Sequence, residues 1–275
     1  MWVGREFCCC NLQNYTREFQ IRARKGRIRE LNIVEIGVIG FGRFGEFLTG
    51  HLSKDCRVYV YGRSDKSDKI KEKNAVPASL EEVCKKDVVV LAVPISEFEK
   101  VLVQIKDILK ENSTVIDVCS VKEYPVKLMN EILPKKTQIL ATHPLFGPDS
   151  VKDSLDGKKV VICRVNVLDT MYNKIKDYLK KKNLIILEIT PEEHDKEIAK
   201  SLLLTHFIGR ALIDLKKSNL DIDTEGYKNL LRILNTAKND TLQLFEDMNH
   251  YNKYAKNVRE DFIRSINDIN KELEK

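Results

Sequence analysis

The feature that most constrains the fold is a regular alternation of short apolar runs and amphipathic segments between residues 34 and 190. The apolar runs are rich in Val and Ile and are short, whereas the segments between them carry apolar residues three or four positions apart. This alternation predicts a doubly wound α/β sheet that is parallel in its main part. We expect strands at 34–40, 57–62, 87–94, 113–119, 138–143, 158–165 and 183–190, and helices at 43–52, 97–109, 125–133 and 168–181.

The pattern changes after Pro191, where helical spacing continues without a convincing strand. The sequence therefore predicts two domains: a Rossmann-like dinucleotide-binding domain over residues 33–189 and an all-helical domain over residues 190–275. The helical segments expected in the second domain are 192–217, 227–248 and 254–275.

Residues 1–32 form a basic extension with seven Arg or Lys and three Glu residues, so the remainder of the chain carries only +2 of the net charge of +6. A near-neutral body is weak support for nucleic-acid binding, which requires cations clustered on a folded surface. The extension lacks the Ser-rich, acid-poor composition of a transit peptide and the apolar core of a secretory signal. We expect it to be disordered and dispensable, and organellar targeting stays open.

Four of the seven cysteines are dispersed through residues 33–275, and no CxxC pair exists. Zinc ligation and thioredoxin-like redox chemistry therefore lack the spacing they need, and we expect no metal. Dispersed cysteines in apolar surroundings are typical of free thiols in a reducing compartment, which favours the cytoplasm. No apolar segment reaches the roughly 18 residues that cross a bilayer, so we expect no membrane partner.

A glycine-rich loop lies between the first predicted strand and the first predicted helix. IGVIGFGRFGEF has the GxGxxG spacing at Gly40, Gly42 and Gly45. The first glycine permits a tight turn, the second lets the backbone approach a pyrophosphate, and the third lets helix and strand pack closely. The positive end of the helix then receives the phosphates. We expect a dinucleotide here, with further contacts from Phe41, Arg43 and Phe44, and from Val93 and Pro94.

The loop after the second predicted strand favours NADP over NAD. NAD-binding proteins place an acidic residue at the end of that strand to hold the ribose 2′-hydroxyl. Here the strand ends at Gly62, and Arg63 and Ser64 follow with a cation and a hydroxyl that suit a 2′-phosphate. Asp65 could instead take the hydroxyl, so NAD remains possible.

Polar residues with catalytic potential follow two later strands. Ser120 and Lys122 come after the run at 113–119, and His143 closes the run at 138–143 in ATHPLFGPDS. Ligands bind at the carboxyl ends of the strands in an open α/β sheet. Imidazole titrates near neutral pH, as a general base requires. His143 is therefore a candidate for a catalytic base, although a histidine beside proline is more often an ordinary loop residue.

The sequence resembles the prephenate/arogenate dehydrogenase family of tyrosine biosynthesis over about residues 33–250. The order of motifs carries the resemblance, and HPLFGPDS is its most specific part. The resemblance implies oxidative decarboxylation of a cyclohexadienol: hydride passes to NAD(P), the 4-hydroxyl loses its proton, and CO2 leaves as the ring becomes aromatic. The matching segments are the glycine loop, DVCSVK (117–122), THPLFGPDS (142–150), EEHDKEIA (192–199) with LTHF (204–207), and YKNLLRIL (227–234).

The resemblance also implies a role for each site residue. His143 would be the base, and Ser120 would hydrogen-bond either His143 or the substrate hydroxyl. His206 would lie near the substrate, Arg232 would bind a substrate carboxylate through its guanidinium, and Lys122 would help to orient a ligand. Residues around His206 and Arg232 depart from the usual motifs, and the choice between prephenate and arogenate stays open. The helical domain implies a homodimer.

Alternatives remain at this stage. Another β-hydroxyacid dehydrogenase of the same architecture would use a lysine of the second domain and would lack the HPLFGP loop. A non-catalytic NADP-binding protein would bind the cofactor without turnover, and nucleic-acid binding would depend on residues 1–32. We interpret His194 as a residue that opens a helix, because Asp195 and the glutamates before it suit the positive helix end.

Overall fold

A single sheet with helices on both faces dominates the first half of the described chain. The structure is a computed structural model that describes residues 34–151 and 154–275. The extension predicted at residues 1–32 lies outside the described residues. Residues 35–275 form one compact unit.

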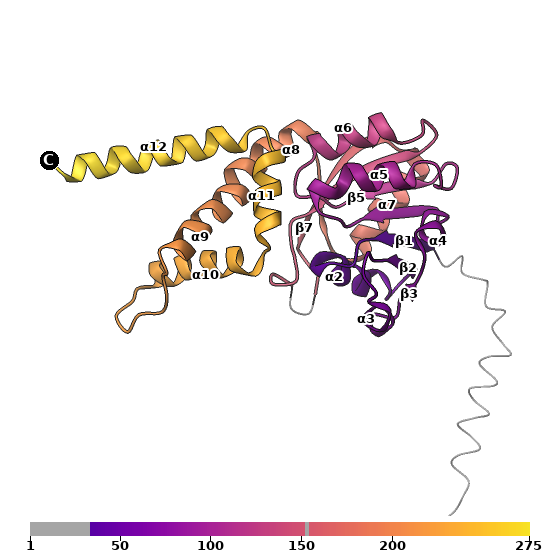
Figure 1. Cartoon of the computed structure of the whole chain (residues 1–275), viewed down its shortest axis with the longest axis horizontal. Coiled ribbons are helices and arrows are strands. Elements are labelled where there is room, and N and C mark those ends of the chain that lie inside the picture. Colours follow the sequence, from indigo (N-terminus) through magenta and orange to yellow (C-terminus); the bar gives the residue numbers. More distant parts are fainter. Residues whose placement is uncertain (1–33, 152–153) are drawn as a thin grey trace, which may run out of the picture. The chain divides into compact units, whose positions relative to one another are not determined.

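Eight strands form this sheet in the order β3-β2-β1-β4-β5-β6-β7-β8 (Figure 1). All neighbours are parallel except β6 and β7, which pair antiparallel. The predicted doubly wound, mainly parallel sheet is confirmed, but the two-residue strand β3 was too short to predict. The strands are β1 (Glu35–Ile39), β2 (Arg57–Tyr61), β3 (Val76–Pro77), β4 (Val88–Leu91), β5 (Thr114–Asp117), β6 (Gln138–Pro144), β7 (Lys159–Asn166) and β8 (Ile185–Glu188).

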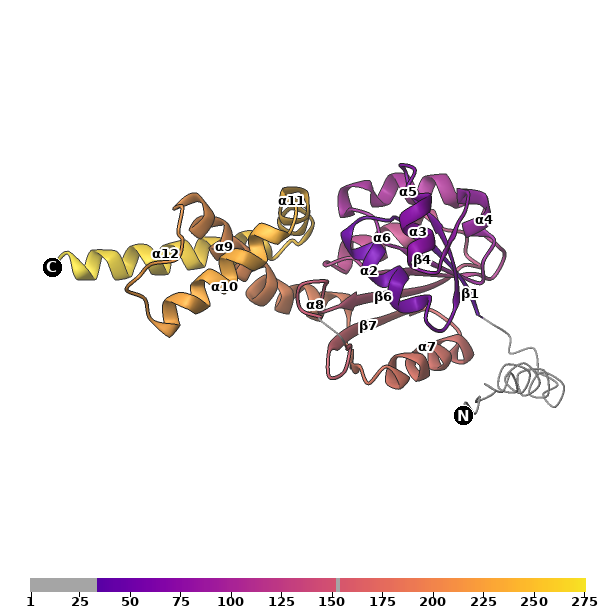
Figure 2. The ribbon, with the colours of Figure 1, turned by 90° about the horizontal axis from the view of Figure 1, so that it is seen from below.

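Helices cover both faces of the sheet because each has one apolar stripe to bury. One buried cluster joins α4, α5 and α6 to the sheet, and a second joins α2, α3 and α7 to its opposite face. Figure 2 shows α5 and α7 on opposite sides of β6 and β7. These helices are α2 (Arg43–Leu52), α3 (Ser67–Glu72), α4 (Leu80–Cys84), the 3-10 helix η1 (Ile95–Glu97), α5 (Phe98–Ile105), α6 (Glu123–Ile132) and α7 (Asp169–Lys181).

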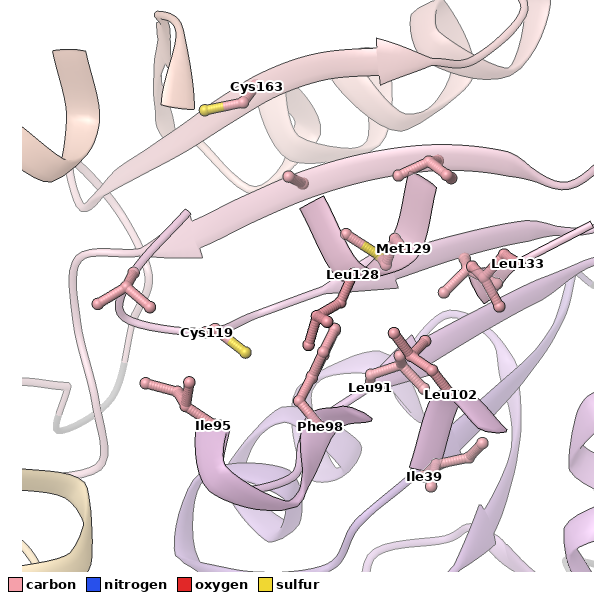
Figure 3. Close-up of a cluster of buried hydrophobic side chains, with 14 of the residues drawn as sticks. Ile39, Leu91, Ile95, Phe98, Leu102, Cys119, Leu128, Met129, Leu133 and Cys163 are labelled. Carbon is pink, nitrogen blue, oxygen red and sulfur yellow. The ribbon is translucent and has the colours of Figure 1, made fainter. Parts of the chain in front are cut away.

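The first cluster fixes the strand ends at which polar residues gather. Phe98 and Leu102 of α5 meet Leu128 and Met129 of α6 against the sheet (Figure 3). Complete burial of an apolar side chain of this size contributes about 1.5–3 kcal/mol relative to exposure. Cys119 lies at the edge of the same cluster, directly after β5, so the loop that follows β5 is held by the core.

The chain changes from α/β to all-helical at Thr190, as predicted. Thr190 caps α8 in a capping box with Glu193, because each residue's side chain accepts a hydrogen bond from the other's backbone N–H. Figure 1 shows only helices beyond this point, in orange to yellow. None of the helices in the described ranges has the length and apolar character that crossing a bilayer requires. They are α8 (Pro191–Ile198), the π-helical turn η2 (Ala199–Leu203), α9 (Leu204–Asp214), α10 (Glu225–Asn239), α11 (Leu242–Tyr251) and α12 (Ala255–Leu273).

The segment expected as one helix over 227–248 is instead two helices. The backbone of Asp240 is extended, with a ψ of 147°, and ends α10. Thr241 then caps α11 by accepting a hydrogen bond from the backbone N–H of Leu244. Apolar spacing continues across this break, so the pattern hid it, although Asp-Thr is a common helix-start signal. The break matters because it delivers Asp240 to the site described below.

Candidate active site

In the turn between β1 and α2, the glycine backbone packs closely against neighbouring backbone carbonyl groups. Gly40 has a φ of +105°, and a Cβ added there would lie 2.2 Å from the carbonyl oxygen of Ala92. A Cβ on Gly45 would lie 2.2 Å from the carbonyl oxygen of Gly40. The conformation and packing of the protein itself therefore require these two glycines.

Gly42 is explained by neither conformation nor packing. Its φ of −78° suits any residue, and an added Cβ would meet no described atom within 4 Å beyond its chain neighbours. Gly42 is also the N-cap of α2 and offers no side chain to the N–H groups of the first turn. An open position at an uncapped helix N-terminus fits a dinucleotide pyrophosphate, which those N–H groups would hold.

The other residues predicted to contact the dinucleotide differ in how exposed their side chains are. The Phe41 side chain is buried in the core, so the expected contact with a dinucleotide would have to come from its backbone. Val93 packs against the turn: its Cγ1 atom would lie 3.0 Å from a Cβ added to Gly40. Arg43, Phe44 and Pro94 are exposed or partly exposed.

The loop after β2 presents cations rather than an unoccupied carboxylate. Arg63 is exposed at 88% of its side chain and lies 3.5 Å from Glu97 across the loop. The carboxylate of Asp65 accepts hydrogen bonds from the backbone and side chain of Ser67, at 3.0 and 2.7 Å. Asp65 therefore stabilises the turn in which it lies. The preceding residue, Ser64, is exposed.

His143, the next-to-last residue of β6, begins a hydrogen-bonded relay of three buried side chains. Its Nδ1 atom lies 2.8 Å from Nε2 of His194, which belongs to α8. Nδ1 of His194 lies 2.7 Å from Oδ1 of Asp195. All three side chains are buried, so their hydrogen bonds face little competition from water.

The carboxylate at the end of this relay sets the proton positions along it. Asp195 can only accept while ionised, so His194 donates to it from Nδ1 and keeps Nε2 as an acceptor. His143 must then donate from Nδ1, which leaves its Nε2 atom unprotonated. The described hydrogen bond of the His143 ring is made by Nδ1, and no described residue bonds to Nε2. The arrangement presents one imidazole lone pair as a general base.

Asp195 is itself held rigidly. Oδ1 accepts a hydrogen bond of 2.7 Å from the backbone N–H of Lys122, and Oδ2 accepts one of 2.9 Å from that of Glu123. These donors open helix α6, so Asp195 caps that helix from another part of the chain. The side-chain amide of Asn252 donates to the Asp195 carbonyl at 2.8 Å.

The structure corrects the interpretation of His194. Thr190 caps α8, and His194 lies in the body of that helix, where it is buried against His143. A signal was available, because His194 precedes Ile198 by four positions and therefore shares its helix face. Ile198 belongs to the buried core.

Ser120 and His143 lie at the carboxyl ends of adjacent parallel strands: Ser120 follows β5, and His143 is near the end of β6. The register pairs Asp117 of β5 with Ala141 of β6, so both residues lie just beyond the paired strand ends. Ser120 is partly exposed and makes no hydrogen bond to another described residue. Of the two hydrogen bonds expected for Ser120, the one to His143 is not formed: the described partner of that ring is His194.

Lys122 does not reach a ligand, which corrects the expectation for this residue. Its side chain is fully buried, and its ammonium forms an ion pair with the equally buried Asp117. The carbonyl oxygen of Asp117 accepts a hydrogen bond of 2.7 Å from the hydroxyl of Thr142. Lys122 therefore has a structural role: it pairs with Asp117, which contacts the strand that carries His143.

His206 lies beside an acidic residue that sequence reasoning missed. Nε2 of His206 is 3.5 Å from Oδ2 of Asp240, and its buried Nδ1 has no partner among the described residues. Oδ1 of Asp240 is 3.1 Å from the Arg43 guanidinium, which also pairs with Asp149 of the HPLFGPDS loop. Arg210 donates to the Asp240 carbonyl at 2.8 Å.

Arg232 is not brought to this site within the single chain. Its side chain is 69% exposed on α10 and pairs with Glu225, at 3.1 Å, and with Asn229, both on the same helix. Arg210 is the guanidinium of the helical half that lies next to Asp240. The predicted contact of Arg232 with a substrate carboxylate therefore has no support from the intrachain geometry.

Burial sets the protonation of all three site histidines. It lowers the pKa of His143 well below the ordinary value of 6.5, and the neighbouring His194 and Lys122 lower it further. Burial also lowers the pKa of His194, although the hydrogen bond to Asp195 opposes that shift, and it lowers the pKa of His206 against the pull of Asp240. The three rings are therefore neutral near pH 7.

Two glycine substitutions should have opposite consequences. Gly42→Ala should leave the free energy of unfolding within about 0.5 kcal/mol of wild type, because the new methyl meets no protein atom. It should weaken dinucleotide binding about tenfold or more, which corresponds to about 1.4 kcal/mol. Gly45→Ala should destabilise the fold by roughly 1–3 kcal/mol, because its methyl overlaps a carbonyl oxygen. Urea unfolding and calorimetric titration measure the two effects, and normal dinucleotide affinity in Gly42→Ala would contradict this assignment.

Acid should destabilise the protein before exposed carboxylates titrate. Unfolded histidines take up protons near pH 6.5, whereas the buried ones do so only at lower pH, so the unfolded state binds more protons in between. The free energy of unfolding should then fall from pH 6.5 to about 5, by up to about 1.4 kcal/mol per pH unit for each histidine. Urea unfolding at several pH values measures this slope. His206→Gln should make it shallower, and an unchanged slope would refute the buried neutral state.

Comparisons with known proteins bear on the family and the fold. Residues 48–187 match the family model described as prephenate dehydrogenase, nucleotide-binding domain, and residues 211–275 match one described as TYRAAT1-like, C-terminal domain. The chain has the fold of prephenate dehydrogenase from A. aeolicus, solved with hydroxyphenyl propionate and NAD+, with a TM-score of 0.70 and 24% identity over 90% of this chain and 94% of that one. Synechocystis arogenate dehydrogenase gives a TM-score of 0.63 at 18% identity, over 87% and 92%.

Two curated relatives come from Arabidopsis thaliana. Arogenate dehydrogenase 2, chloroplastic, is 32% identical over 90% of this chain and 72% of its own length. Arogenate dehydrogenase 1, chloroplastic, is 31% identical over 90% of this chain, which spans only 40% of that relative's length. The motif order, the fold and these matches agree, and the chain therefore belongs to the prephenate and arogenate dehydrogenase family.

Proposed function

We propose that the protein is a dehydrogenase that oxidises and decarboxylates arogenate with NADP+. The observation that carries this proposal is the His143–His194–Asp195 relay, which presents a neutral imidazole at the carboxyl edge of the sheet. The open position at Gly42, at the N-terminus of α2, supports a dinucleotide cofactor. When bound, the nicotinamide supplies the hydride acceptor.

In this proposal His143 removes the proton from the 4-hydroxyl through Nε2. As the proton arrives, Nδ1 of His143 keeps donating to His194, whose other nitrogen is held by Asp195. The ring carboxylate leaves as CO2 as the substrate becomes aromatic. Ser120, in the loop after the neighbouring strand β5, would hydrogen-bond the same hydroxyl and orient it, which supplies part of the rate through positioning.

Asp240 supports arogenate over prephenate. The two substrates differ only in a side-chain amino or keto group, and a carboxylate attracts an ammonium group but gains no such attraction from a neutral keto group. Asp240 lies beside His206, the residue expected near the substrate. The Arabidopsis relatives carry arogenate in their names as well.

The loop after β2 supports NADP over NAD. The side chain of Arg63 is 88% exposed there and can turn to a 2′-phosphate at little cost. Lys66 adds a second ammonium, 3.0 Å from the Phe41 carbonyl oxygen. Asp65, the carboxylate of this loop that could select a 2′-hydroxyl, already accepts two hydrogen bonds from Ser67 at Oδ1, which hold it in its own turn.

The cytoplasm stays our proposed location. Cys84, Cys119 and Cys163 are buried free thiols, as expected for a reducing compartment. The Arabidopsis relatives are named as chloroplastic, and a role of residues 1–32 in targeting is a separate proposal that an import assay with and without them would test.

The function is tested by measuring NADPH and NADH formation with arogenate and with prephenate. We expect the highest kcat/KM for arogenate with NADP+. His143→Gln should lower kcat by roughly 10²–10⁴ with unchanged NADP+ affinity. His194→Phe should lower kcat by about 10–100-fold, because it removes the partner that fixes the tautomer of His143.

A matched control separates the base from the substrate contact. Asp240→Asn should reduce the preference for arogenate and leave the pH profile of kcat unchanged, since Asp240 lies outside the relay. Full activity in His143→Gln would show that the base is misassigned. Tight NADP+ binding without turnover of either substrate would favour the non-catalytic alternative.

We also propose a homodimer formed through the helical half. Four large apolar residues of α12 are exposed at spacings of three and four positions and so form one face: Ile263, Ile266, Ile269 and Leu273. The wild-type chain should sediment as a dimer. Ile266→Asp should shift it toward monomer, and Lys271→Asp, on the same helix, should not; a wild-type chain that stays monomeric at micromolar concentration would contradict the proposal.

A further inference from the structure

Arg43 lies between the glycine-rich turn, where the dinucleotide is expected, and the helical half of the chain. It is the first residue of α2, directly after Gly42. Nη2 pairs with Asp149, while Nη1 lies 3.1 Å from Oδ1 of Asp240 and donates to the carbonyl oxygen of Asn239 at 3.2 Å. One guanidinium therefore serves two carboxylates from separate parts of the chain.

A dinucleotide would offer the same guanidinium a competing partner. The pyrophosphate is expected at the N-terminus of α2, beside Gly42, which places anionic oxygens next to Arg43. Arginine binds phosphate through two parallel hydrogen bonds, as it binds carboxylate. The ion pairs of Arg43 are partly exposed, with 41% of its side chain accessible, so exchanging one partner for another has a small cost.

The other oxygen of Asp240 faces the substrate side of the site. Oδ2 lies 3.5 Å from Nε2 of His206, and the backbone carbonyl of Asp240 is fixed by Arg210. Asp240 thus contacts the cofactor loop through one carboxylate oxygen and the proposed substrate region through the other. Its negative charge is available to a substrate ammonium only to the extent that Arg43 does not neutralise it.

We propose that Arg43 couples cofactor binding to recognition of the substrate's amino group. Without dinucleotide, Arg43 neutralises Asp240. With dinucleotide bound, the phosphates attract the guanidinium, and the Asp240 carboxylate is released to accept the ammonium. This inference rests on the proposed function, because it assumes an amino acid substrate.

The coupling predicts a difference between two ligands that differ by one amino group. L-tyrosine carries the ammonium, and 3-(4-hydroxyphenyl)propionate lacks it. NADP+ should tighten L-tyrosine binding by roughly tenfold, within the range usual for coupled sites, and should change the affinity for the propionate much less. Neither ligand can be oxidised by this reaction, so the titrations measure binding alone.

The test is calorimetric titration of the full chain with each ligand, with and without saturating NADP+. Arg43→Gln should bind L-tyrosine more tightly than wild type when NADP+ is absent, because Asp240 is then always released, and NADP+ should add little further. Asp149→Asn is the matched control: it removes the other carboxylate partner of Arg43 and should keep the coupling. A structural defect at Arg43 would lower affinity and would not produce this gain.

The outcomes separate this inference from the proposed function. Equal effects of NADP+ on both ligands, or coupling that survives in Arg43→Gln, would overturn the inference and leave the dehydrogenase proposal intact. If neither ligand binds while NADP+ does, the proposed substrate class fails, and the inference fails with it.

Discussion

The carboxylate of Asp195 is the interaction on which the rest of the site depends. It accepts hydrogen bonds from the backbone N–H groups of Lys122 and Glu123 and from Nδ1 of His194. Two of these donors begin α6, which covers the sheet, and the third belongs to α8, the first helix of the helical half. Each hydrogen bond to a charged group contributes about 1.5–3 kcal/mol, and its loss leaves a buried donor unpaired. One side chain thus joins the two halves and orients the catalytic imidazole.

A buried ion pair supports the same strand ends from within the sheet. Lys122, whose backbone binds Asp195, places its ammonium on Asp117 with no exposure to solvent. Burying two charges rarely adds net stability, but removing one partner from such a pair is strongly destabilising. Thr142 also binds the Asp117 carbonyl and directly precedes His143. The ion pair holds the side chain of Asp117, and Thr142 binds its backbone, so both contacts join the end of β5 to the strand that carries His143.

The sequence predicted the elements whose signal is local. Gly40, Gly42 and Gly45 were identifiable because their spacing follows from a turn, a phosphate and a helix contact within a few residues. His143 was identifiable because a strand end and a proline define its place. Asp240 was not, because apolar spacing runs across the break between α10 and α11.

The partners of His143 and Lys122 could not be predicted for a different reason. Asp195 and Glu193 look alike in EEHDKE, yet one caps α6 from inside the protein and the other belongs to an exposed capping box. Which carboxylate turns inward depends on where α8 packs, and that is decided by contacts with residues more than 70 positions away in the chain. Lys122 is likewise indistinguishable from a ligand-binding lysine until the buried Asp117 beside it is seen.

Burial and the relay act on His143 in complementary ways. Burial, His194 and Lys122 lower its pKa, which keeps the ring neutral and its lone pair available. A base with a lowered pKa is by itself a weaker proton acceptor. The relay offsets this weakness, because the imidazolium would donate to His194, whose far nitrogen is bound to a fixed carboxylate in a site with little water. Burial thus keeps His143 neutral and ready to accept a proton. Once His143 is protonated, Asp195 stabilises its positive charge through His194.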